Sequence, residues 1–132
     1  MINTGIITKN SIHNFEDTYQ NIKSIIENNP NLKIILELDH QANAASVGMN
    51  LQPTKIILFG NPKLGTPLMQ ENLLLGLDLP QKILVTKNVN GAVSVSYNDP
   101  KYLKERHYIV NKDDILEKVI NALDTITTKA TI

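Results

Sequence analysis

The stretch ILVTKNVNGAVSVSY, residues 83–97, decides the fold class of this chain. Residues 83–87 are mostly aliphatic, residues 92–97 alternate apolar with polar side chains, and an Asn-Gly pair at 90–91 lies between them. Asn-Gly favours the tight turns that join antiparallel strands, because both residues tolerate a positive φ. We therefore predict a β-hairpin at this place, flanked by further strands and helices.

Outward from the hairpin, helical and strand patterns alternate. From Ile12 to Ile26, apolar residues recur every three or four positions, which is typical of a helix with one buried face. The run LKIILELD at 32–39 is a predicted strand, and its apolar centre suggests burial on both faces. Further strands are predicted over 2–8 and 54–59, with a turn over 9–11. Three further helices are predicted: a short one over 41–47 that ends at Gly48, a short one capped by Asp99 and Pro100, and a last one after Asn111 whose final residues fray.

Composition restricts the classes of function. The chain has 132 residues, 42% of them hydrophobic, so we expect a single α+β domain over 1–132. Lys plus Arg equals Asp plus Glu at 13 each, which gives no net field that would direct the protein to nucleic acid or to a membrane. The absence of cysteine excludes disulfides, thiolate metal sites and cysteine nucleophiles. The first residues do not show a basic stretch followed by a long apolar run, and no segment approaches the roughly 20 apolar residues of a membrane span, so we expect a mature, soluble, cytoplasmic protein.

Several strings together resemble a known family. They are DHQANAA at 39–45, LFGNPKLGTPLM at 58–69, LDLPQKILV at 77–85, NGAV at 90–93 and SYNDPKYLKERH at 96–107. In this order they resemble the uncharacterised family called domain of unknown function 302, over nearly the whole chain from the first helix to His107. The resemblance implies a sheet of about five strands with helices mainly on one face, in a TBP-like β-α-β(4)-α arrangement, and a homodimer. It implies no reaction.

The segment FGNPKLGTP, residues 59–67, joins a predicted strand to a helix that Thr66 would cap and Pro67 would enter in its first turn. Its two glycines have the spacing of a phosphate-binding loop. That motif needs a lysine directly after the second glycine, whereas here the lysine is Lys63, so we do not expect nucleotide triphosphate hydrolysis. A helix N-terminus with Lys63 beside it would still suit a small anion or carboxylate. The alternative is that these residues only turn the chain.

Asp39 and His40 follow the strand at 32–39. Since adjacent strand residues point to opposite faces, we expect Asp39 to cap the next helix and His40 to be the freer group. His40 is thus a candidate general acid or base, with a hydrogen-bonded structural histidine as the alternative. A metal site built from both His40 and His107 would need carboxylates, and Asp78 and Asp99 have no recognised spacing, so we predict no metal and no cofactor.

Two further groups are ambiguous. Asn98, Tyr102 and His107 present an amide, a phenol and an imidazole within ten residues and could line one edge of a pocket, although a histidine at a helix end also gains from the helix dipole. The leucines at 73, 74, 75, 77 and 79 are by default core. If some of them are exposed, a two-fold dimer is the natural explanation.

Three functional hypotheses follow, ranked in this order. The first is a ligand-binding domain that holds an anionic group at this loop; its candidate residues are Asn61, Lys63, Thr66, Asn98, Tyr102 and His107, with His40 nearby. The second is an enzyme that uses His40 as general acid or base and Lys63 as an electrostatic stabiliser on a small polar substrate. The third is a dimeric scaffold with no small ligand. The sequence leaves open whether the protein is an enzyme.

Overall fold

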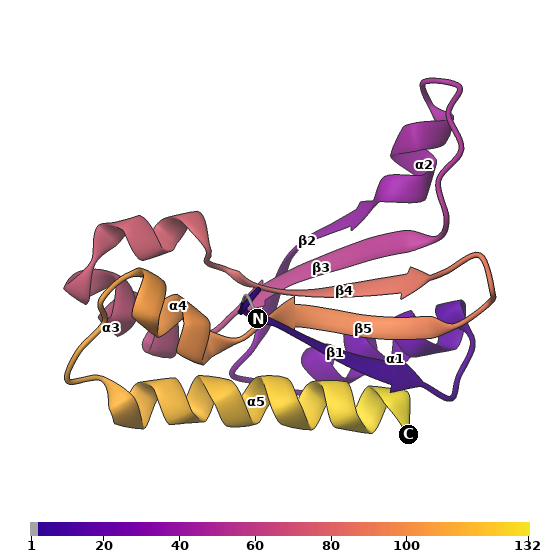
Figure 1. The fold of residues 1–132 in the computed structure, drawn as a ribbon. Coiled ribbons are helices and arrows are strands. Elements are labelled where there is room, and N and C mark those ends of the chain that lie inside the picture. Colours follow the sequence, from indigo (N-terminus) through magenta and orange to yellow (C-terminus); the bar gives the residue numbers. More distant parts are fainter. Residues whose placement is uncertain (1–2) are drawn as a thin grey trace.

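A computed structural model describes residues 3–132 of the chain (Figure 1). The elements in chain order are β1 (Ile6–Ser11), α1 (Phe15–Glu27), β2 (Lys33–Asp39), α2 (His40–Ala45), β3 (Thr54–Gly60), α3 (Pro62–Glu71), the 3-10 helix η1 (Leu73–Leu77), β4 (Gln81–Lys87), β5 (Val93–Asn98), α4 (Pro100–Arg106) and α5 (Asp113–Thr131). This order confirms the predicted α+β class and the β-α-β(4)-α succession, with α2, α3, η1 and α4 as additional helices.

The five strands form one antiparallel sheet in the order β1-β5-β4-β3-β2. The predicted hairpin is confirmed as β4–β5, and Gly91 at its turn has a φ of +88°. The predicted turn at 9–11 is wrong, because these residues belong to β1 and pair with β5. The first strand, predicted over 2–8, begins at Ile6, so residues 3–5 precede it, and residue 2 lies outside the described residues.

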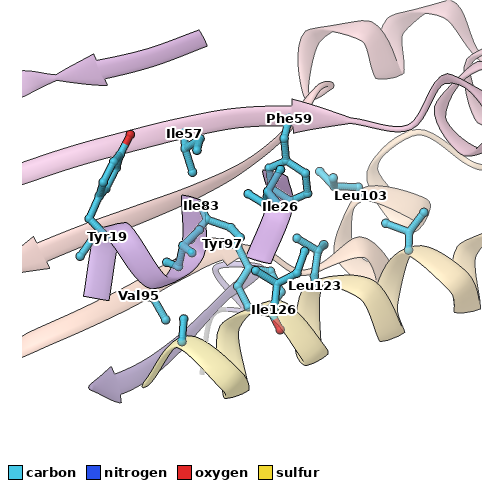
Figure 2. Close-up of a cluster of buried hydrophobic side chains, with 14 of the residues drawn as sticks. Tyr19, Ile26, Ile57, Phe59, Ile83, Val95, Tyr97, Leu103, Leu123 and Ile126 are labelled. Carbon is cyan, nitrogen blue, oxygen red and sulfur yellow. The ribbon is translucent and has the colours of Figure 1, made fainter. Parts of the chain in front are cut away.

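Helices α1 and α5 cover one face of the sheet and pack against each other (Figure 1). Because strand side chains alternate between faces, residues such as Ile57, Ile83 and Val95 point toward these helices and are fully buried (Figure 2). The predicted fraying of the last residues is wrong. Ala130 and Thr131 are buried, and the Ile12 N–H donates to the Thr131 carbonyl at 3.0 Å.

Strand β2 is an edge strand, and the predicted burial on both of its faces is wrong. Ile35 and Leu36 are 55% and 47% exposed. The register shifts between Ile34 and Leu36, so Ile35 lies at a bulge. A continuous apolar run indicates a strand but does not distinguish a central strand from an edge strand, because strand order depends on the whole chain.

Helix α2 extends beyond the sheet at the end of the β2–β3 pair opposite to α3 (Figure 1). As predicted, the Asp39 side chain caps it, accepting from the Ala42 N–H at 2.9 Å, and Gly48 follows it with a φ of +75°. No residue of α2 is buried. This helix is therefore held by its cap and its chain connections and has little core packing.

Candidate functional site

Helix α3 begins five residues earlier than predicted. Asn61 is its N-cap, with the side-chain oxygen accepting from the Lys63 N–H at 3.1 Å, and Pro62 occupies the first turn. Thr66 and Pro67 therefore lie inside the helix, and the predicted cap at Thr66 is wrong. The segment contains two pairs of a capping residue followed by proline, and sequence reasoning chose the second pair.

A pocket of about 370 Å³ lies between the start of α3, η1 and the edge strand β2. Its apolar walls include Ile35, Met69 and Leu79. Its polar groups come from Lys33, Asn61 and Thr66. The volume falls within the range of about 300–1,000 Å³ that small-molecule sites occupy. Two residues of the predicted ligand site, Asn61 and Thr66, thus meet at a real concavity.

The cation at this pocket is Lys33, and the predicted Lys63 does not line it. Lys33 pairs in register with Gly60, the residue immediately before Asn61. This pairing places the start of β2 beside the start of α3, although the two segments are nearly thirty residues apart in the chain. Lys63 points elsewhere and is exposed. Only the pairing of β2 with β3 could reveal Lys33, because nothing local in the sequence links it to the loop.

Leu79 and Pro80 form one wall of the pocket, and a polar cluster around the neighbouring Asp78 fixes this wall from behind. The Asp78 carboxylate bonds the buried His107 Nε2 at 2.6 Å and the Arg106 Nη1 at 3.0 Å. The Lys82 Nζ donates to the carbonyl oxygens of Asp78 and Pro80, at 2.9 and 3.1 Å. Burial lowers the pKa of Lys82, and the charge of Asp78 opposes this effect. His107 therefore positions the wall and does not line the pocket.

The remaining candidate residues lie elsewhere. Tyr102 packs its ring on Gly5, where an added Cβ would lie 2.2 Å from the ring, and Gly5 has a φ of +68°. Asn98 lines a separate hollow on the open face of the sheet. The structure thus divides Asn98, Tyr102 and His107 among three different environments, and they do not line one common pocket.

His40 and Lys63 are also far apart. Asp39, just before His40, pairs with Lys55 at one end of β3, while Lys63 follows the other end at Gly60. Five residue steps along β3 separate these ends, a distance of roughly 16 Å at about 3.3 Å per residue. A single catalytic centre that uses both residues, as the second hypothesis requires, is not formed in this structure.

Three of the five leucines around Gly76 are exposed, so the default expectation of core is wrong for them. Leu73, Leu74 and Leu77 are 83%, 64% and 72% exposed, whereas Leu75 is 3% exposed. The short 3-10 helix turns one leucine inward and leaves the others on the surface. We call these three residues the leucine patch.

Among residues 3–132, no three His, Asp or Glu side chains converge in a group that could hold a metal ion. None of the helices in the same part of the chain has the length and apolarity that a membrane crossing requires.

Comparisons with known proteins agree with the fold. A crystal structure of an uncharacterized conserved DUF302 protein from Bacillus stearothermophilus matches with a TM-score of 0.84. The match covers 97% of this chain and 99% of that chain, at 17% sequence identity. Such a likeness supports the architecture of the sheet and helices and carries no information about a ligand.

Curated relatives include proteins named Fluoride-specific ion channel FluC 1 of Brucella suis and FluC 2 of Brucella melitensis. Each is 32% identical over 128 residues, which is 96% of this chain. The chain spans about half the length of these relatives, 50% and 47% respectively. The activity for which these relatives are named is therefore that of a longer protein.

A family model decides the classification that the sequence strings suggested. It matches residues 7–126, from β1 into α5. The matched span includes the pocket at α3 and the cluster around Asp78. This protein belongs to the family described as Domain of unknown function DUF302.

Proposed function

We propose that this domain binds a small molecule with an anionic head and an apolar body in the pocket beside α3. The observation that supports this proposal most directly is the pocket of about 370 Å³, which combines Lys33, Asn61 and Thr66 with apolar walls. Sites for small molecules are mostly apolar and have a few polar groups that fix orientation. A carboxylate is the simplest head group that satisfies a lysine, an amide and a hydroxyl together.

The arrangement of the pocket supports an elongated ligand. Lys33 and Ile35 lie on the edge strand, while Met69 and Leu79 come from α3 and from the segment before β4. An anionic head beside Lys33 would leave the apolar body in contact with Met69 and Leu79. The N-terminal end of α3 adds a partial positive charge near Asn61.

Hexanoate is a suitable probe, and hexanamide is its uncharged counterpart. Titration followed by amide chemical shifts should perturb Lys33, Asn61 and Thr66 with hexanoate and much less with hexanamide. The Lys33→Met variant should bind hexanoate about fivefold more weakly, the worth of a partly exposed ion pair.

The matched control is Lys63→Met, which removes the cation that sequence reasoning favoured. It should leave hexanoate affinity unchanged, because Lys63 does not line the pocket. Loss of binding in Lys63→Met together with normal binding in Lys33→Met would contradict the proposal.

The names of the relatives suggest a second probe, fluoride. The apolar walls predict that fluoride binds this domain more weakly than hexanoate does, because a bare halide uses none of the apolar surface. Fluoride binding that exceeds hexanoate binding at the same amides would favour a link to the activity for which the channels are named.

The dimeric scaffold remains a second candidate, and the leucine patch favours it. Three leucines that are each at least 64% exposed lie within five residues of one another. A two-fold axis through this patch would bury each copy of it against the other. The homodimer that the family resemblance implies therefore has a specific surface to test.

Light scattering on the purified chain measures this association directly. We expect a dimer for the unmodified protein and a monomer for a variant with serine at positions 73, 74 and 77. The control replaces Val47 and Met49 by serine, since these two are as exposed but lie beyond α2. A monomeric unmodified protein would eliminate the scaffold hypothesis.

A further inference from the structure

The face of the sheet that α1 and α5 leave uncovered has two chemically different halves. On β2 and β3 its side chains are aliphatic, among them Leu36, Leu38 and Ile56. On β5 and β1 they are hydroxyl and amide groups apart from Ile6, and the oxygen atoms of Ser96 and Thr8 lie 2.9 Å apart. A hollow of about 180 Å³ lies where the two halves meet.

Lys82 is the charged residue in this hollow, and it is not part of the pocket beside α3. The β4–β5 ladder ends at the pair Leu84 and Ser96, and extending its register by two residues brings Lys82 level with Asn98; both residues line the hollow. Facing residues on neighbouring antiparallel strands have Cβ atoms about 5 Å apart. The ammonium and the amide therefore approach the hollow from adjacent strands.

The donors of these groups are only partly used. Lys82 Nζ donates to two backbone carbonyls, at 2.9 and 3.1 Å, so one of its three N–H bonds is left over. Within residues 3–132, no hydrogen bond engages the Asn98 side-chain amide. The two carbonyl contacts also restrain the lysine side chain, so an anion would meet an ammonium group already held in place.

We propose that this hollow is a second binding site, which takes the carboxylate of a short-chain organic acid. Lys82 and Asn98 donate to the carboxylate oxygens, and the Ser96 hydroxyl lies at the same edge. Ile6, Ile56 and Leu84 form the apolar floor and walls against which the hydrocarbon part lies. This site is independent of the proposed function and would stand if the α3 pocket binds nothing.

The floor of the hollow argues for an organic acid over inorganic phosphate. A doubly charged phosphate would need more donors than one spare ammonium N–H, one amide and one hydroxyl, and it would desolvate against aliphatic side chains. A monocarboxylate needs fewer donors and gains from the apolar contacts.

Butyrate is the probe, with butyramide and inorganic phosphate as comparisons. In an amide chemical-shift titration, butyrate should perturb Lys82, Leu84, Ser96 and Asn98, and butyramide should do so weakly. Perturbation at these positions is read separately from perturbation at Lys33, Asn61 and Thr66, so the two sites are distinguished in one experiment.

Two variants test the donors. Lys82→Met keeps the hydrocarbon stem and should weaken butyrate binding about tenfold, the worth of a charge-assisted hydrogen bond. Asn98→Ala should weaken it about threefold, the lower value expected of a neutral donor, and it leaves the carbonyl contacts of Lys82 intact. Asn98→Ala therefore still tests the proposal if Lys82→Met disturbs the segment before β4.

Lys87→Met is the matched control, because it makes the same change on the same strand but on the helix-covered side, level with Val93. It should bind butyrate as the unmodified chain does. The proposal is overturned if butyrate causes no shifts at Lys82 and Asn98, if butyramide or phosphate binds there as tightly, or if Asn98→Ala binds butyrate normally.

Discussion

The two ends of the β2–β3 pair each lead to a helix, and the two helices differ greatly. Asn61 caps α3 by accepting from a backbone N–H at 3.1 Å, and Asp39 caps α2 in the same way at 2.9 Å. Yet α3 has a buried residue, Leu68, and borders the largest apolar-walled pocket described above, whereas α2 buries nothing.

The difference shows what a cap can and cannot do. A cap stabilises the first turn of any short helix, and both sequences supply one. A helix as short as α2 depends on tertiary contacts for further stability, because isolated short helices are marginal in water. At the α3 end those contacts come from α5 and η1. A binding site can form there because the surrounding elements hold its walls.

The largest expected effect is on the free energy of unfolding, which should depend far more on a buried residue at the α3 end than on an exposed residue after α2. Phe59 lies at the α3 end of β3 and is 2% exposed, whereas Met49 follows α2 and is 65% exposed. Phe59→Ala should lower the free energy of unfolding by about 4 kcal/mol, since it leaves a cavity in the core. Met49→Ala should change it by less than about 0.5 kcal/mol. Urea denaturation monitored by circular dichroism measures both, and comparable losses would show that the region after α2 is packed after all.

The next largest effect on stability concerns the polar cluster around Asp78 that fixes the pocket wall. Asp78→Ala removes the acceptor of the buried His107 and should cost about 3 kcal/mol, because a buried polar partner is left unpaired. Asp78→Asn, which keeps an oxygen acceptor, should cost less. The same denaturation experiment tests the order of these variants. Equal stability of Asp78→Ala and the unmodified chain would mean that the polar cluster around Asp78 does not stabilise the α3 end of the molecule.

A smaller effect compares the two caps directly. Asn61→Ala and Asp39→Ala each remove one capping acceptor and should each cost about 1 kcal/mol where the helix is part of the cooperative fold. We expect that cost for Asn61→Ala. For Asp39→Ala we expect little change in global unfolding and faster amide hydrogen exchange within α2, because a locally unstable helix opens without the rest of the chain. Equal global losses would contradict this distinction.

The smallest effect is electrostatic and lies on β2 between the two ends. Glu37 accepts from the Tyr19 hydroxyl at 2.6 Å, and this bond, with help from Lys23, holds the pKa of the Glu37 carboxyl below its ordinary value despite some burial. A lowered pKa in the folded state stabilises the protein above the unfolded-state pKa, and that contribution disappears as pH falls through the folded-state pKa.

Tyr19→Phe removes the hydroxyl and should raise the Glu37 pKa toward its ordinary value, so the variant should lose less of its stability on acidification. A carboxyl titration by NMR checks the shift, with the unmodified chain as the reference. No change in the Glu37 pKa would assign its lowering to Lys23 and Lys55 instead.

Parts of this molecule were predictable because their causes are local. The Asn-Gly hairpin, the Asp39 cap and the apolar stripe of α1 from Phe15 to Ile26 each depend on a few neighbouring residues, and all three are confirmed. Ile12, the predicted start of that stripe, precedes the helix and is 80% exposed. The start of α3 was not predictable in the same way, because two capping pairs compete within one short segment. The choice between them depends on where β3 ends against β2.

The candidate site was predictable in part. Asn61 and Thr66 belong to one segment, the sequence named both as ligand-binding candidates, and both line the pocket beside α3. Lys33 reaches the pocket only because β2 pairs with β3. Lys63, the cation that the local sequence favoured, does not line the pocket. Exposure of the leucine patch also depends on packing, since a leucine-rich stretch reads as core until its neighbours are known.

The sequence by itself determined the element types, their order, the hairpin and the α+β class, because backbone preferences, turn chemistry and side-chain periodicity act over a few residues. Only the tertiary structure decided that β2 lies at an edge, that Lys33 lines one pocket with Asn61 and Thr66, that His107 is bound to Asp78, and that Lys82 and Asn98 line one hollow. Each of these contacts joins residues well separated along the chain, and their meeting depends on strand order and register, which are set by the packing of the whole sheet against α1 and α5.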